Sequence, residues 1–293
     1  MTSRARSGDP PQGYYGLPLF KPPVWTWEVP AYFLVGGAAG AAAAVAAVAR
    51  ASAAPAGLVT HARWIAAAGG AMSPVLLVSD LGRPERFLNM LRVFKPQSPM
   101  SVGAWTLVVF SNAAAATILA DVAQRRSQSR SLRVTERVVE TIAAATGVVV
   151  ATYTGVLLGA TAIPVWARHA GLLPLHFGAS GLGTAVSLLE LMGHREMALR
   201  RLAIGAAAVE MLAGAVVEAD WNGAAEPLKR GRSGRIARAG GALAGPLPLV
   251  LRLAGRRSSR ARLLAAFATV VGAALTRVGW VAAGRARQTH ATR

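Results

Sequence analysis

Long stretches without a charged side chain limit this chain to few kinds of fold. The clearest are Val29–Ala49, Pro96–Ala120 and Thr141–Ala167, and each can supply the ~20 consecutive residues that a helix needs to cross a bilayer. The chain is 53% hydrophobic and only 15% charged, which is unusually apolar for a soluble protein. The sequence therefore predicts an all-α integral membrane protein.

Other apolar stretches predict further membrane helices. We expect residues 1–28 to form a polar N-terminal segment, 29–285 a transmembrane domain and 286–293 a polar tail. Arg63 is expected to extend toward the membrane surface, and Gly36, Gly37 and Gly40 to let a second helix approach closely. No cleavable signal peptide is visible in the polar first segment. The pattern predicts about eight transmembrane helices, at roughly Glu28–Ala49, Gly57–Ser79, Met100–Asp121, Val138–Leu158, Pro174–Leu191, Leu202–Ala219, Ala239–Leu253 and Arg262–Ala283.

The net charge of +19 does not indicate nucleic-acid binding, because the arginines lie in connections between apolar runs. We expect Gln124–Arg137 and Asp220–Arg238 to be aqueous loops. In an eight-helix arrangement, lysine and arginine are almost equally shared between the two sides of the membrane. Their distribution therefore does not decide which side the N-terminus faces. The chain has no cysteine, which excludes iron–sulfur clusters and c-type haem held by this chain. The histidines fall in expected loops or at helix ends, so we expect no b-type haem and no metal site.

The segment Leu77–Trp105 is a strongly patterned polar interruption. Gly82 and Pro84 break the backbone, and apolar residues then recur at helical spacing until prolines end the pattern. Its charged residues could pair with one another in water, or they could hold a partner or a ligand head group. They are Asp80, Arg83, Glu85, Arg86, Arg92 and Lys95.

Two polar residues of the first expected helix could contact a quinone, and a tyrosine of the fourth expected helix needs a hydrogen-bond partner. Glu28 and Tyr32 are four residues apart and share a helix face, so a carboxylate and a phenol could meet the quinone oxygens and take up a proton. The alternative is a helix-terminal acid beside an interfacial tyrosine anchor. Tyr153 lies deep in its helix and needs a hydrogen-bond partner, which a ligand or a neighbouring helix could supply. Both interpretations remain open from the residues alone.

Glu210 lies in the middle of the sixth expected helix. Acids inside a membrane are costly and are often functional, so Glu210 could belong to a proton path. Pairing with a neighbouring helix is the structural alternative. A transporter or ion-translocating subunit built around Glu210 is therefore the second function that the sequence allows.

Two segments carry a resemblance to a known family. They read WTWEVPAYFLVGGAAGA and LVSDLGRPERFLNMLRVFKPQSPMSVGAW, and YTGVLLGATAIPVW extends the similarity. With them the chain resembles the NrfD/PsrC family, the membrane subunits of polysulfide-reductase-like complexes. Weaker similarity continues through AEPLKRGRSGRIARAGGAL. The resemblance implies eight helices in two four-helix bundles, in a bacterial inner membrane.

The resemblance also implies a function in electron transfer. Family members bind menaquinone or ubiquinone, carry no haem, and exchange electrons with an iron–sulfur subunit that serves a catalytic subunit, commonly a molybdopterin enzyme. The family's quinone residues fall on Glu28, Tyr32 and Tyr153, although better-known members have other polar side chains in the first helix. Asp80, Arg83 and Arg86 are then expected to shape the quinone entrance or the docking side. The chain is expected to be a quinone-reactive respiratory subunit that is not catalytic alone.

Overall fold

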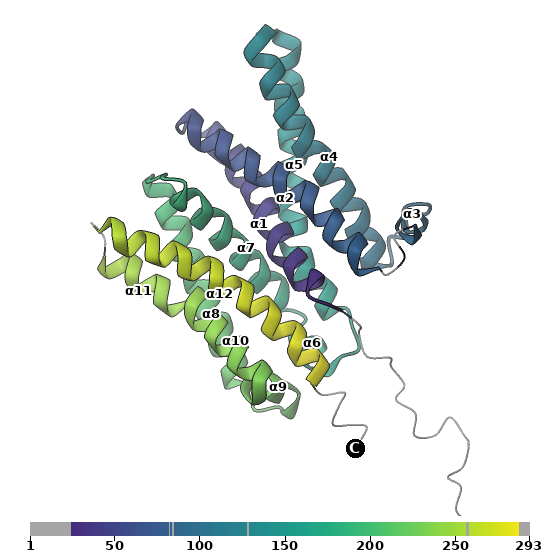
Figure 1. The fold of residues 1–293 in the computed structure, drawn as a ribbon, viewed down its shortest axis with the longest axis vertical. Coiled ribbons are helices and arrows are strands. Elements are labelled where there is room, and N and C mark those ends of the chain that lie inside the picture. The colour runs from purple at the N-terminus through teal and green to yellow at the C-terminus, as the bar shows by residue number, and fades with distance from the viewer. Residues whose placement is uncertain (1–24, 82, 84, 128, 256–257, 287–293) are drawn as a thin grey trace, which may run out of the picture.

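The computed structural model describes residues 25–81, 83, 85–127, 129–255 and 258–286, and all regular structure within these ranges is helical. The N-terminal half contains α1, α2, α4 and α5, and the C-terminal half contains α7, α8, α10, α11 and α12 (Figure 1). The longer helices are α1 (Glu28–Ala51), α2 (Ala56–Asp80), α4 (Pro99–Ser127), α5 (Arg130–Gly159), α7 (Leu173–Leu191), α8 (Met197–Ala219), α10 (Gly231–Ala244), α11 (Pro246–Ala254) and α12 (Ser259–Ala286).

Helix α1 occupies the centre and packs against α2, α5, α7 and α12. Its glycines permit this position. A Cβ atom on Gly40 would lie 2.2 Å from the carbonyl oxygen of Gly147 in α5. A Cβ atom on Gly181 in α7 would lie 2.7 Å from the carbonyl oxygen of Gly37. The predicted close approach at the glycine face is therefore confirmed, and it joins α1 to both halves.

Six helices of the described chain are long and apolar enough to cross a membrane, namely α1, α2, α4, α5, α8 and α12. They confirm an integral membrane protein. Helix α7 and the α10–α11 pair lie beside them, and eight spans in two bundles remains a prediction. The expected seventh helix over Ala239–Leu253 is wrong as one helix, because Gly245 and Pro246 divide it. Proline lacks the backbone N–H for a continuous helix and disfavours the helical conformation at the residue before it.

Two expected aqueous loops are largely helical. Helix α4 continues to Ser127 and α5 begins again at Arg130, so most of Gln124–Arg137 extends a helical hairpin. Arginine, leucine and glutamate are good helix formers, which makes this extension favourable. Asp220–Arg238 contains the short helices η1 (Gly223–Ala225) and α9 (Glu226–Lys229) and the start of α10.

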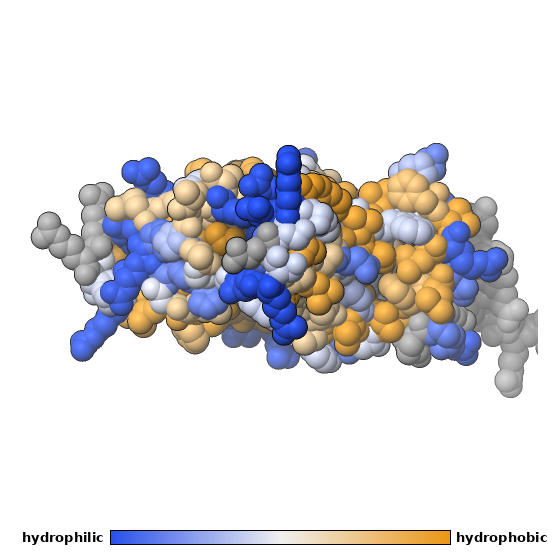
Figure 2. Space-filling model, turned by 90° about the horizontal axis from the view of Figure 1, so that it is seen from above, coloured by the Kyte–Doolittle hydropathy of each residue, from blue (hydrophilic) through white to orange (hydrophobic). Residues whose placement is uncertain are grey.

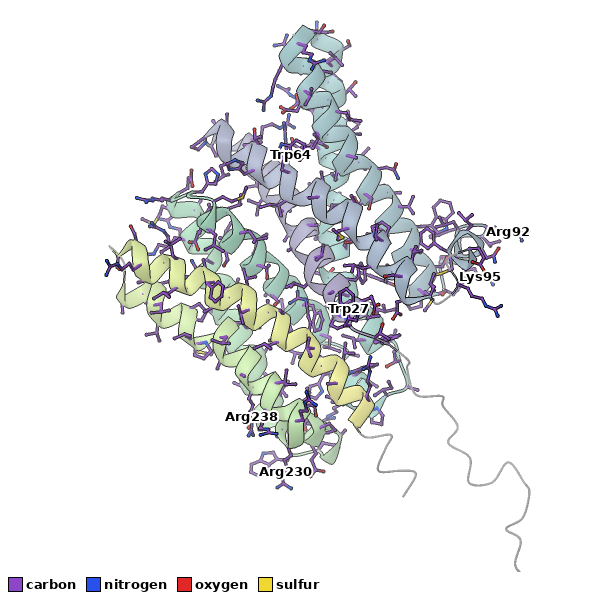
Figure 3. All side chains as sticks on the ribbon, viewed as in Figure 1. Trp27, Trp64, Arg92, Lys95, Arg230 and Arg238 are labelled. Carbon is purple, nitrogen blue, oxygen red and sulfur yellow. The ribbon has the colours of Figure 1, made fainter. Side chains whose placement is uncertain are left out.

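Three short helices lie at one end of the long ones, near the start of α1 and the end of α12 (Figure 1). They are α3 (Arg86–Met90), α6 (Pro164–Arg168) and α9, and we call this end the α3–α6–α9 end. Trp27 lies near it and Trp64 lies toward the opposite end, and both rings are exposed (Figure 3). Hydrophobic areas alternate with hydrophilic side chains on the face seen in Figure 2. Exposed aromatic and apolar side chains of this kind are typical of a lipid-facing surface.

Candidate functional site

The start of α1 and the end of α2 meet at the α3–α6–α9 end. The hydroxyl of Thr26 donates a hydrogen bond to Asp80 Oδ1 at 2.8 Å, and the Thr26 backbone N–H reaches the same oxygen at 3.2 Å. The same hydroxyl also contacts the carboxylate of Glu28. Asp80 and Glu28 are therefore gathered around one threonine. The start of the Leu77–Trp105 segment, which we call the Asp80 segment, therefore lies beside the beginning of α1.

Tyr32 lies one turn further into the membrane than Glu28, and its side chain is buried. Its ring contacts the backbone of its own helix at Gly36, where an added Cβ atom would lie 3.1 Å from Tyr32 Cε2. The same Cβ atom would lie 3.2 Å from the hydroxyl oxygen of Ser73 in α2. The ring is thus held between α1 and α2.

Tyr153 of α5 crosses to α4. Its hydroxyl donates to the carbonyl oxygen of Pro99 at 2.6 Å, and its ring occupies the space above Gly103, where any Cβ atom would overlap it. Pro99 and Gly103 lie in the first turns of α4, so this contact is at the same α3–α6–α9 end as Asp80. Tyr32 and Tyr153 both lie toward this end of the N-terminal half, and Glu28 lies one turn before Tyr32 in α1. The Pro99 hydrogen bond makes Tyr153 an interhelical tether, and its oxygen can still accept a second hydrogen bond.

The other predicted residues of the Asp80 segment are less enclosed. Arg83 is exposed, and Arg86 begins α3, although its side chain lies outside the described residues. Trp25 stacks on Trp166 with ring centroids 5.0 Å apart, so it is packed against α6 rather than placed freely at the surface. Within the described side chains, Asp80 contacts the start of α1. Asp80 bonds to Thr26.

A buried ion cluster at the opposite end was missed by the sequence reasoning. Arg63 is 5% exposed, so the expectation that it extends to the surface is wrong. Its guanidinium donates to Glu140 at 2.8 Å, to Asp121 at 3.0 Å and to Glu136 at 2.6 Å. Arg50 also pairs with Glu140. The sequence did contain a signal for this cluster. Glu136 and Glu140 are four residues apart, so they share one face if this part of the chain is helical.

Glu210 is buried in the C-terminal half, next to a histidine that the sequence reasoning had set aside. His176 Nδ1 lies 3.5 Å from Glu210 Oε2, and both side chains are nearly inaccessible. Arg277 of α12 is fully buried nearby and donates to Ser180 Oγ at 2.7 Å and to the Ala273 carbonyl at 3.0 Å. Among the side chains described, no group of three or more histidines and acids is placed to hold a metal ion.

The N-terminal two-thirds of the chain also has a family assignment. Residues 18–211 match the family described as Polysulphide reductase, NrfD. The chain belongs to the NrfD family. The match contains Glu28, Tyr32, Asp80, Tyr153 and Glu210, and it ends before α10–α12, where the sequence suggested weaker similarity. No curated protein matches the chain. NrfD proteins are membrane-integral subunits of oxidoreductase complexes, and the fold of this one agrees with that role.

Proposed function

We propose that this NrfD protein is the quinone-reactive membrane subunit of a multisubunit oxidoreductase. The observation that carries the proposal is the gathering of Glu28, Asp80, Tyr32 and Tyr153 at one end of the N-terminal half. Two carboxylates meet at Thr26, and two phenols come from α1 and α5 toward the same end. This set offers hydrogen-bond acceptors, donors and aromatic surface to a quinone head group.

The proposed chemistry follows from the charges. A hydroquinone that becomes a quinone releases two electrons and two protons. Tyr32 and Tyr153 would hydrogen-bond the head-group oxygens, and the carboxylates of Glu28 and Asp80 would accept the protons near the aqueous surface. In the reverse direction the same groups would return the protons. The electrons require a partner, since a chain without cysteine holds no iron–sulfur cluster of its own.

The α3–α6–α9 end is the proposed docking side for an iron–sulfur ferredoxin-like subunit, which would connect to a catalytic subunit, commonly a molybdopterin enzyme. Exposed Arg92 and Lys95 beside α3 and exposed Arg230 beside α9 give this end positive charge (Figure 3). Such charges steer an acidic partner more than they add affinity. Arg83 and Arg86 belong to the same proposed surface. Menaquinone or ubiquinone from the bilayer would be the substrate.

Turnover of a soluble hydroquinone analogue by the purified complex tests the site. Glu28→Gln should lower the rate by about a hundredfold, since a positioned acid–base group contributes at least that much. Tyr153→Phe should lower it by about tenfold, since it removes one hydrogen bond to the head group. Glu226→Gln changes an exposed carboxylate in α9 at the same end and should leave the rate unchanged. Unchanged turnover in both site variants would remove Glu28 and Tyr153 from the proposal.

Glu210 is far from these groups in the sequence and belongs to the other half. The proton path through Glu210, and the ion- or solute-translocating function built around it, remain predictions. Its buried position fits the expectation that an acid within a membrane helix has a function or a partner.

A further inference from the structure

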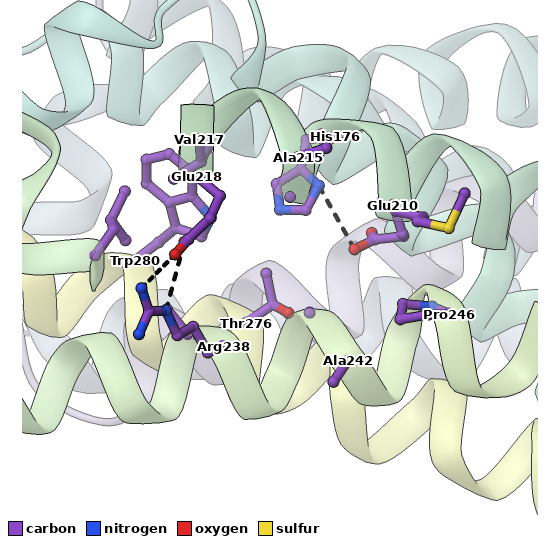
Figure 4. A pocket seen from close by; sticks show the side chains of 16 residues that line it. His176, Glu210, Ala215, Val217, Glu218, Arg238, Ala242, Pro246, Thr276 and Trp280 are labelled. Atoms are coloured by element: carbon purple, nitrogen blue, oxygen red, sulfur yellow. Dashed lines mark hydrogen bonds and ion pairs between the residues drawn. The ribbon is translucent and has the colours of Figure 1, made fainter. Parts of the chain in front are cut away.

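A cavity of about 420 Å³ lies between α8, α10 and α12 in the C-terminal half. This volume is in the range of small-molecule sites in proteins. Small residues form much of its wall, including Ala213, Gly214, Gly241 and Ala242, and the indole of Trp280 adds aromatic surface. At one side Glu218 of α8 pairs with Arg238 of α10 (Figure 4). The cavity is therefore mainly apolar, with charged groups at a few points.

Glu210 supplies the acidic group of this cavity. Its side chain is 2% exposed, and neither carboxylate oxygen has a hydrogen-bond partner within the described part of the chain. Figure 4 shows the carboxylate directed toward the imidazole of His176, but the 3.5 Å separation is too long for a good hydrogen bond. A buried carboxylate without hydrogen bonds is costly. An additional donor in the cavity would remove that cost.

Two further polar groups of the cavity are also left without partners. The residues His176 and Thr276 line the cavity. The atoms His176 Nδ1 and Thr276 Oγ1 are buried and make no hydrogen bond in the described structure. Arg277, a buried cation of α12, directs its Nη1 group at Ser180 and at the carbonyl of Ala273. The unused groups are an acceptor pair, an imidazole nitrogen and a hydroxyl. Together they match a head group that both donates and accepts hydrogen bonds.

We propose that this cavity binds a lipid-soluble molecule with a hydroxyl-bearing head group, and that the hydroxyl donates to the carboxylate of Glu210. The apolar walls would hold the hydrophobic part, and Trp280 would pack against the head group. The bilayer offers two sources of this chemistry, a hydroquinone and a hydroxyl-bearing glycerolipid. The site uses none of the residues around Tyr32 and Tyr153, so it does not rest on the proposed function.

Binding of two labelled probes to the purified full chain in detergent tests the proposal. The probes are a decyl hydroquinone and 1-oleoylglycerol. Gly214→Leu fills the cavity, and Gly205→Leu is the matched control on the same helix outside it, because an added Cβ atom at either glycine meets nothing within 4 Å. We expect Gly214→Leu and Glu210→Gln to weaken one of the probes by about tenfold or more, as loss of a hydrogen bond to a charged group predicts. Gly205→Leu should bind like the unmodified chain.

The probe whose binding is weakened shows whether the cavity ligand is a hydroquinone or a hydroxyl-bearing glycerolipid. Any hydroquinone that binds beside Tyr153 adds the same amount of binding in Gly214→Leu and in Gly205→Leu. The difference in probe binding between these two variants therefore measures the cavity alone. A Tyr153→Phe change should leave that difference intact, which separates this site from the proposed quinone site. Glu210→Gln keeps the shape of the side chain and tests the site if Gly214→Leu does not fold. Equal binding of both probes by Gly205→Leu and the two cavity variants would overturn the proposal.

Discussion

Glu140 in the N-terminal half and Glu210 in the C-terminal half are both 2% exposed, yet their surroundings differ. Glu140 receives a 2.8 Å hydrogen bond from Arg63 and pairs with Arg50. The cavity beside it is about 10 Å³, roughly the space of one water molecule. Glu210 has no hydrogen bond in the described structure and borders a cavity of about 420 Å³.

The contrast separates two uses of a buried charge. Around Arg63, three carboxylates from α4 and α5 meet three arginines, so the cluster is balanced and ties α1, α2, α4 and α5 together. The C-terminal half can also pair its acids, because Arg252 Nη1 donates to Glu190 Oε1 at 2.7 Å. The isolation of Glu210 is therefore not a general property of its half. Glu210 differs from Glu190 in that it borders the cavity and has no arginine hydrogen-bonded to it in the described structure.

Removing Arg63 should produce the largest loss of stability. Arg63→Met keeps most of the side-chain volume but leaves Glu136, Glu140 and Asp121 without their shared cation. Breaking a buried ion pair from one side costs about 3–5 kcal/mol. Thermal or denaturant unfolding of the purified protein in detergent should show a loss of that size, or the variant should fail to accumulate in the membrane.

Arg125→Met is the control for this cluster. Arg125 pairs with Asp121 at 2.8 Å, but its side chain is 61% exposed. Exposed ion pairs contribute about 0–1 kcal/mol, so this variant should remain close to the unmodified chain. Equal stability of the Arg63 and Arg125 variants would show that the cluster does not hold the helices together.

The two glutamates of the C-terminal half provide a second, smaller test. Glu190→Gln weakens a hydrogen-bonded pair with Arg252 and leaves that guanidinium buried with less charge compensation, so we expect a loss of about 1.5–3 kcal/mol. Glu210→Gln removes a charge that has no hydrogen bond, so the empty protein should be equally stable or more stable. Parallel unfolding of both variants without added ligand distinguishes them. A large loss on Glu210→Gln would mean that its carboxylate is structurally paired after all.

The membrane class and most helix positions could be predicted because hydrophobicity is a local property of the chain. The uncharged stretches predicted the positions of α1, α4 and α5. The glycines of α1 predicted that another helix packs closely against it. The break at Gly245–Pro246 was visible as prolines but was not used to divide the helix. The α4–α5 hairpin was misread because charged residues predicted a loop. There the arginines extend two helices whose acids meet Arg63.

The candidate sites depend on contacts between residues far apart in sequence. The sequence indicated only that Asp80 helps to shape the quinone entrance. It did not reveal that Thr26 connects Asp80 to Glu28. His176 was dismissed because it begins a helix, and only the packing of α7 against α8 places it beside Glu210. Arg277 is a charged residue within the otherwise apolar last helix. Its burial is explained by Ser180 and backbone carbonyls, which no local pattern reveals.

Asp220 offers the smallest test, because it caps the same helix as Glu210 but lies at the aqueous end. Hydrogen bonding from the backbone N–H of Asn222, followed by the Arg168 guanidinium, lowers the pKa of Asp220 below its usual value. A lowered folded-state pKa adds stability above the ordinary pKa of about 4, and this contribution is lost as pH falls through the lowered value. His169 Nε2 lies 3.4 Å from the same carboxylate, so its charge also favours the ionised form in acid. The unfolding midpoint of Asp220→Asn should fall slightly below that of the unmodified chain near neutral pH, and the two should converge in strong acid. If the difference between the two unfolding midpoints stayed constant down to acid pH, the effect of Asp220 would come from its geometry rather than from its charge. The electrostatic comparison between the two halves would then depend on the buried acids alone.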